Sequence, residues 1–176
     1  MAKSATINKV SLNVADMLRH HYQQHELVLA VHPSETDLRF MVRVLAFALN
    51  AHDDLTFTKG LATDDEPEAW QKSLSDEIEL WIDFGQVDEK RIRKACGRSK
   101  QVVIYTYQAR KAGVWWEKNE QILARHDNLS VFHIEAEGIE ALAGRNMHIQ
   151  CNIDEGVVSL GNDELHIDVA VTQYGV

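Results

Sequence analysis

Hydrophobic and polar residues alternate strictly along residues 77–86, which read Glu-Ile-Glu-Leu-Trp-Ile-Asp-Phe-Gly-Gln. This period of two predicts a β-strand with one face in a core. The first face is wholly apolar, and the second carries carboxylates beside a tryptophan: Glu77, Glu79, Trp81 and Asp83. Like charges on one face repel each other. The acidic face is therefore either exposed to water, as one face of an antiparallel sheet commonly is, or it holds a metal cation.

The rest of the chain also divides into strand-like and helix-like segments. Strands are predicted at residues 5–15, 25–32, 55–61, 101–107, 129–134, 147–153, 157–160 and 164–173. Helices are predicted at residues 34–49, 88–97 and 113–126, with a short helical turn at 69–74. Ser34 is the predicted N-cap of the first helix, with Asp37 three residues on. Gly97 is the predicted C-terminal stop of the second helix.

The order of these elements predicts a fold class. Between residues 77 and 134 the chain runs strand–helix–strand–helix–strand, a pattern that favours parallel crossovers in one sheet. Strands dominate toward both termini. We therefore expect a mixed α/β fold with β-rich ends. The length of 176 residues predicts a single domain over residues 1–176.

The composition predicts the class of protein and its cellular compartment. Hydrophobic residues make up 45% of the chain and charged residues 26%, which is usual for a soluble globular protein. No apolar run is long enough to cross a membrane. Cys96 and Cys151 do not form a CxxC pair and fit a reducing compartment. We expect a cytoplasmic protein with no membrane partner.

The charges are unevenly distributed. The net charge of −9 lowers the expectation of a free-standing nucleic-acid binder, because such proteins usually present a basic face to phosphates. Yet six basic residues fall within residues 90–100: Lys90, Arg91, Arg93, Lys94, Arg98 and Lys100. This segment is either a solvent-facing helix or a surface that contacts phosphate.

Three segments resemble a known family: His32-Pro-Ser-Glu-Thr-Asp, Gly60-Leu-Ala-Thr-Asp-Asp-Glu-Pro-Glu and residues 79–95. Together they resemble the bacterial YaeQ family, and the resemblance covers essentially the whole chain. That family is similar to a variant of the PD-(D/E)xK nuclease superfamily, which includes restriction endonucleases and repair exonucleases. The resemblance implies a restriction-endonuclease-like core with extra β-strands at the N- and C-termini.

The resemblance also implies candidate metal ligands. In the superfamily a helix supplies a Glu, one strand supplies an Asp after Pro, and the next strand supplies (D/E)xK. The carboxylates hold Mg²⁺, which neutralises the charge that develops on phosphate. Carried onto this chain, the first two ligands are Glu35 and Glu68, with Glu66 as an alternative to Glu68. Asp83 would be the third ligand, and Glu79 on the same strand face is a further candidate.

The third motif departs from the superfamily pattern. Gly85 stands where the lysine belongs, and Gln86 follows it. Gln86 could enter the site if the strand ends or bulges at Gly85, because glycine permits that backbone. Alternatively, the following helix could supply a cation through Lys94 or Arg91.

Two functions follow from these residues. The first is Mg²⁺-dependent phosphodiester hydrolysis by a nuclease-like protein with an altered active site, whose catalytic residues would be Asp83, Gln86, Glu68 and Lys94. The second is a non-catalytic domain on the same fold that binds DNA, RNA or a protein through Arg91, Lys94 and Arg98. A structural alternative remains for Glu35, which could simply form an ion pair with Arg39 one helical turn later.

Overall fold

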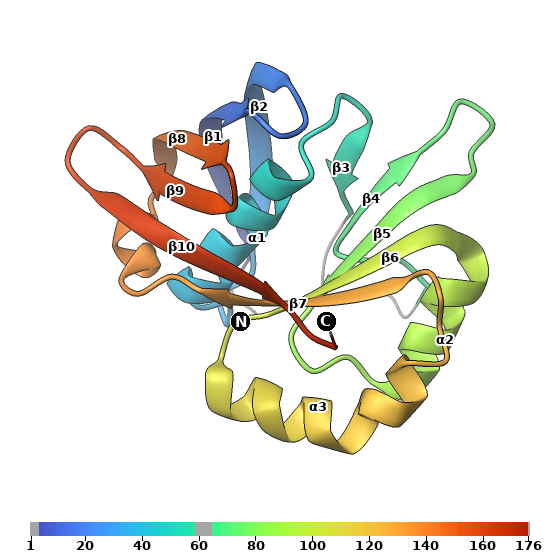
Figure 1. Cartoon of the computed structure of the whole chain (residues 1–176). Coiled ribbons are helices and arrows are strands. Elements are labelled where there is room, and N and C mark those ends of the chain that lie inside the picture. Colours follow the sequence, from blue (N-terminus) through green and yellow to red (C-terminus); the bar gives the residue numbers. More distant parts are fainter. Residues whose placement is uncertain (1–3, 59–64, 176) are drawn as a thin grey trace. The chain divides into compact units, whose positions relative to one another are not determined.

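The computed structural model describes residues 4–58 and 65–175, which form two compact units (Figure 1). Unit 1 comprises Met1–Ala51 and Ala136–Ala170, and unit 2 comprises His52–Glu135 and Val171–Val176. Both units combine helices with a sheet, so the chain has a mixed α+β fold in which strands predominate.

Unit 1 is built on a sheet with the strand order β2-β1-β8-β9-β10. Its strands are β1 (Thr6–Asp16), β2 (His21–Val31), β8 (Asn146–Asp154), β9 (Val157–Gly161) and β10 (His166–Gln173), whose last residues belong to unit 2. β1 pairs antiparallel with β2 and parallel with β8. β9 pairs antiparallel with both β8 and β10. The predicted strands near both termini are therefore present.

The core of unit 1 lies between this sheet and helix α1 (Asp37–Leu49). Val10, Leu12 and Val14 are fully buried at alternate positions of β1, as period-two patterning requires. Phe40 to Ala48 are buried along α1. The helix packs against β8 and against the short 3₁₀ helix η1 (Ile139–Leu142).

The N-cap of α1 is not the predicted residue. Thr36, rather than Ser34, is the N-cap, and its side chain accepts a hydrogen bond from the N–H of Arg39 at 3.1 Å. The Ser34 hydroxyl is instead paired with the imidazole of His32 at 2.6 Å. The local sequence contains two hydroxyl residues with suitable spacing, and tertiary placement of the helix decides between them.

Unit 2 contains neighbouring strands in the order β7-β6-β5-β4-β3. Its strands are β3 (Leu55–Phe57), β4 (Ala69–Lys72), β5 (Ile78–Phe84), β6 (Ser99–Thr106) and β7 (Leu129–Glu135). β3, β4 and β5 pair antiparallel, whereas β5, β6 and β7 pair parallel. The predicted parallel crossovers are confirmed.

The crossovers are made by helices α2 (Glu89–Arg98) and α3 (Ala109–Leu123) (Figure 1). Ile92 of α2 and Trp115 of α3 share one core cluster with Ile104 of β6 and Val131 of β7. The indole N–H of Trp115 donates to the buried carbonyl of Val87 at 2.9 Å.

Within the described residues, no helix is long and apolar enough to cross a membrane.

Two further predictions in unit 2 are wrong. Residues 69–72 form β4 and not a helical turn, because Trp70 pairs across strands with Trp81 and the segment completes the antiparallel edge. Gly97 lies inside α2, which ends at Arg98 with Ser99 as an extended C-cap. The strand predicted at 55–61 is present as β3, and its residues 59–61 lie outside the described part of the chain.

The capping assignment predicts unequal effects of two alanine substitutions. Thr36→Ala should lower the free energy of unfolding by about 1 kcal/mol, because one N–H of the first turn loses its acceptor. Ser34→Ala is the matched control and should change it by less than about 0.5 kcal/mol. Urea denaturation followed by circular dichroism measures both values. An equal loss in the two variants, or a larger loss at Ser34, would contradict the assignment.

Candidate functional site around Asp83

Asp83 lies near the carboxyl end of β5, on the strand face that the sequence marks as acidic. Its side chain is only 4% exposed, and Trp81 on the same face is fully buried. Trp81 packs with Ala95 of α2 and Val102 of β6. Of the two alternatives for this face, exposure to water does not hold for its carboxyl-terminal half, because the crossover helix α2 covers it.

Both carboxylate oxygens of Asp83 accept hydrogen bonds. The Arg91 guanidinium bridges them, with Nε 2.7 Å from Oδ2 and Nη2 2.8 Å from Oδ1. The indole N–H of Trp81 donates to Oδ2 at 2.8 Å, and the amide of Glu68 donates to Oδ1 at 3.2 Å. A bidentate guanidinium is among the strongest neutral-pH partners of a carboxylate. The donor set satisfies Asp83 as an ion pair and does not fit Mg²⁺, which would compete for the same oxygens.

Glu68 follows Pro67 and leads into β4. Its N–H also donates to the carbonyl of Ile82 at 3.1 Å, and its carbonyl accepts from the N–H of Thr58 at 3.1 Å. These bonds fix the Pro67–Glu68 backbone directly against Asp83. The structure thus brings together the second and third candidate positions of the superfamily pattern.

Three cations of α2 contact the short segment Asp65–Glu66. Arg91 Nη2 donates to the Glu66 carbonyl at 2.8 Å, and Arg98 Nη1 donates to the Asp65 carbonyl at 2.7 Å. Lys94 forms an ion pair with the Asp65 carboxylate. We call Arg91, Lys94 and Arg98 the basic face of α2. Its spacing of three and four residues is that of one helix face.

The basic face borders a polar pocket of about 300 Å³. The pocket is lined by Asp65, Asp88, Lys90, Arg91 and Lys94. Asp88 is the N-cap of α2 and accepts from the N–H of Arg91 at 2.9 Å. Three cations and two carboxylates therefore line the pocket, at the helix end whose dipole favours anions.

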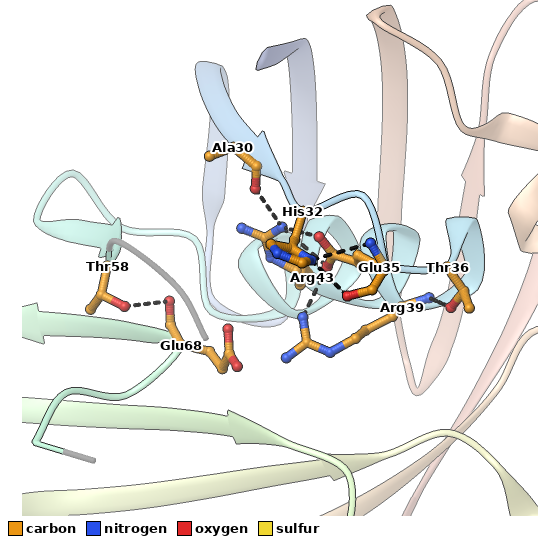
Figure 2. A network of polar contacts seen from close by, with 9 residues as sticks. Ala30, His32, Glu35, Thr36, Arg39, Arg43, Thr58 and Glu68 are labelled. Carbon is orange, nitrogen blue, oxygen red and sulfur yellow. Dashed lines mark hydrogen bonds and ion pairs between the residues drawn. The ribbon is translucent and has the colours of Figure 1, made fainter. Parts of the chain in front are cut away.

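Glu35 is placed in unit 1, just before α1. Its carboxylate lies 2.9 Å from Arg39 and 2.9 Å from Arg43 (Figure 2). The Glu35 side chain is 2% exposed and the Arg43 side chain 5% exposed. Arg43 also donates to the carbonyl of Ala30 at 3.2 Å. The ion pair with Arg39 is present as the structural alternative predicts, and Arg43 adds a second cation.

The remaining candidates lie apart from Asp83. Glu79 is hydrogen-bonded to Lys100 at 2.7 Å, and this bond is the main reason that the pKa of Lys100 is raised. Gly85 has a φ of +77° and β5 ends just before it, which is the backbone expected if Gln86 were to enter the site. Gln86 is nevertheless exposed, and the cation that reaches Asp83 comes from Arg91.

The described residues do not gather a carboxylate metal centre. In residues 4–58 and 65–175, no group of three or more His, Cys, Asp or Glu side chains is arranged to hold a metal ion. Asp83 is paired with Arg91, Glu35 with two arginines and Glu79 with Lys100. Each of these three candidate ligands is therefore paired with an arginine or a lysine of the chain.

Neither cysteine is suited to nucleophilic chemistry at neutral pH. Burial raises the pKa of the Cys96 thiol to about 11. Burial, with a smaller contribution from the charge of Asp16, raises the pKa of Cys151 to about 12. Because the thiolate is the reactive form, both side chains remain protonated and act as core residues.

Sequence reasoning missed two participants. The indole of Trp81 is a donor to Asp83, and the signal was present, because residues two apart on a strand share a face. Glu35, Arg39 and Arg43 follow each other at steps of four residues, which predicts that they share one side of the helix, but the ion pair between Glu35 and Arg43 was not predicted.

Comparison with known proteins decides the family. The family model described as "YaeQ protein" matches residues 1–171. The chain belongs to the YaeQ family. Its relatives include "Uncharacterized protein YaeQ" of Escherichia coli (strain K12), which is 42% identical over 99% of this chain and 98% of that protein. The protein of the same name in Salmonella typhi is 38% identical over the same shares.

Solved YaeQ structures share the fold. The crystal structure of YaeQ protein from Xanthomonas axonopodis pv. citri is 40% identical and has a TM-score of 0.93, covering 97% of this chain and 98% of that one. The YaeQ protein from Pseudomonas syringae is 30% identical, with a TM-score of 0.91 over 98% and 97% of the two chains. Both comparisons extend over nearly the whole length of each chain.

The Asp83–Arg91 pair predicts a large effect of removing the cation. Arg91→Met should lower the free energy of unfolding by about 3 kcal/mol, because it leaves a buried carboxylate without its counter-charge. Arg93→Met is the matched control, since that side chain is 68% exposed on the same helix. Its expected effect is within about 0.5 kcal/mol. Urea denaturation at neutral pH compares them, and similar losses in both variants would refute the buried pair.

Proposed function

We propose that this chain is a non-catalytic nucleic-acid-binding domain built on a nuclease-like core. The observation that carries the proposal is the Arg91 guanidinium on both oxygens of Asp83. A cation of the chain thus takes the place that the superfamily pattern gives to a metal ion. The basic helix α2 lies beside Asp83, and both carboxylate oxygens of Asp83 already accept hydrogen bonds.

The order of elements supports the nuclease-like core. A helix with Glu35 at its start comes first, then Pro67-Glu68 at the start of β4, and then Asp83 in β5. This is the order of helix, strand after proline and next strand in the superfamily pattern. The backbone of Glu68 touches Asp83, which is the proximity that the pattern requires. Fold likeness alone does not establish activity.

The charge of α2 supports contact with phosphate. Between Glu89 and Arg98 the helix carries five basic residues and one acidic residue. Lys90, Arg91 and Lys94 line the 300 Å³ pocket at its N-terminal end. Local positive charge of this kind neutralises the phosphate backbone even in a protein that is acidic overall. Nucleic acid would therefore be held by its backbone at the pocket and basic face of α2.

The proposal predicts salt-dependent binding that depends on one side of α2. A Lys90→Glu/Lys94→Glu variant should bind labelled oligonucleotides at least about tenfold more weakly than wild type at low salt. The slope of log Kd against log salt should fall by about two, one for each phosphate contact removed. Fluorescence anisotropy with single-stranded and duplex DNA and RNA measures both quantities.

Arg93→Glu is the charge control for this experiment, because Arg93 lies outside the pocket on the same helix and its expected effect is below about threefold. Equal weakening by the control would mean that binding follows net charge and not this site. A salt-insensitive complex would refute phosphate contact and indicate a protein partner.

A second function, metal-dependent phosphodiester hydrolysis, is favoured by one observation. The backbone N–H of Glu68, which follows Pro67, donates to the Asp83 carboxylate, so these two motif positions are adjacent. Hydrolysis would require Arg91 to leave Asp83 so that a divalent cation could bind. It would also require another cation to replace the missing lysine, for which Lys94 is the candidate. We favour binding without cleavage because the ion pair already satisfies Asp83.

A further inference from the structure

A second pocket in unit 2, of about 490 Å³, lies away from the basic face of α2. It is formed by the carboxyl-terminal half of α3, the first residues of β7 and the last described residues of the chain. Its volume falls in the range of small-molecule sites, about 300–1,000 Å³. None of its lining residues belongs to the Asp83 site or to the 300 Å³ pocket.

One wall of this pocket is a fixed aromatic pair. The rings of Trp116 and Tyr174 stack with centroids 4.6 Å apart and planes 20° apart. The N–H of Tyr174 donates to the carbonyl of Val131 at 2.9 Å, which ties the C-terminal stretch to β7. Gly175 follows with a φ of +78°, and a Cβ there would lie 3.7 Å from the Trp116 ring. The wall is therefore preformed by stacking and by a backbone hydrogen bond.

The charge of the pocket selects among ligands. Among the described residues that line it, Glu120 is the only carboxylate and His126 the only basic side chain, with no Lys or Arg. Gln121, Ser130 and Gln173 add neutral hydrogen-bonding groups, and Leu123, Leu129 and Val131 add apolar surface. A phosphate or carboxylate ligand would find no Lys or Arg here, would meet only the imidazole of His126, and would be repelled by Glu120. A cation would find the Glu120 carboxylate in the same lining as the stacked rings of Trp116 and Tyr174.

We propose that this pocket binds a small organic amine with an apolar or aromatic body. The ammonium group pairs with Glu120, and the body lies against the Trp116–Tyr174 wall and the aliphatic residues of β7. An organic cation suits the pocket because aromatic rings and a carboxylate attract positive charge, while the apolar part of the lining disfavours a fully hydrated inorganic ion. This activity is separate from binding of nucleic acid at α2.

Three probes that share a phenyl ring but differ in charge test whether the pocket prefers a cation. They are 2-phenylethylamine, 2-phenylethanol and phenylacetate, each titrated into the whole chain and followed by two-dimensional NMR of backbone amides and indole N–H groups. The amine should shift the signals of Trp116, Ser130 and Tyr174 and bind about fivefold more tightly than the alcohol, as expected for a partly exposed ion pair. Phenylacetate should bind more weakly than either.

Variants locate the effect. Glu120→Gln should make the affinities for the amine and the alcohol equal. Glu117→Gln is the control, because Glu117 lies on the same helix but does not line the pocket, and it should leave the preference for the amine unchanged. Ala124→Trp places a large side chain at an exposed lining position and should abolish binding of all three probes. Equal binding of amine and alcohol to wild type, a preference that survives Glu120→Gln, or no shifts at the pocket would each overturn the proposal.

Discussion

The buried ion pair between Asp83 and Arg91 is the interaction on which the organisation of unit 2 depends. A carboxylate that is 4% exposed is costly unless a cation and hydrogen-bond donors surround it. Arg91 supplies the cation from the crossover helix, Trp81 adds a donor from the same strand, and the Glu68 amide adds another from the start of β4. One side chain thus fixes the position of α2 over β5 and the position of the Pro67–Glu68 segment.

This constraint also shapes the chemistry that the protein can perform. Arg91 has two roles. Its guanidinium neutralises the Asp83 carboxylate, and it adds to the positive charge of α2. A guanidinium cannot lose its proton in a protein, so it does not act as a base. It does bind phosphate oxygens well. This pairing is the reason for proposing recognition of phosphate without hydrolysis at α2, whereas the ligand proposed for the pocket beside Trp116 and Tyr174 is cationic.

Much of the fold could be predicted because hydrophobic periodicity reports directly on it. Strict alternation located β5, and the strand–helix–strand order gave the parallel pairing of β5, β6 and β7. Local chemistry was less informative. Ser34 and Thr36 are equivalent as caps until the helix is placed, and Trp70 favours a strand only once Trp81 lies opposite it. The departure at Gly85 pointed to Lys94 or Arg91 as a replacement cation, and of these Arg91 contacts Asp83. Burial of the acidic face depends on a helix that periodicity does not place.

Calorimetric titration of Mn²⁺ and Mg²⁺, comparing wild type with Asp83→Ala, tests the central claim most directly. If Arg91 satisfies Asp83, neither cation gives saturable heat in wild type, and the substitution leaves the titration unchanged. Saturable binding in wild type that disappears in Asp83→Ala would contradict the claim. That result would mean that Asp83 is a metal ligand and that Arg91 gives way to the ion.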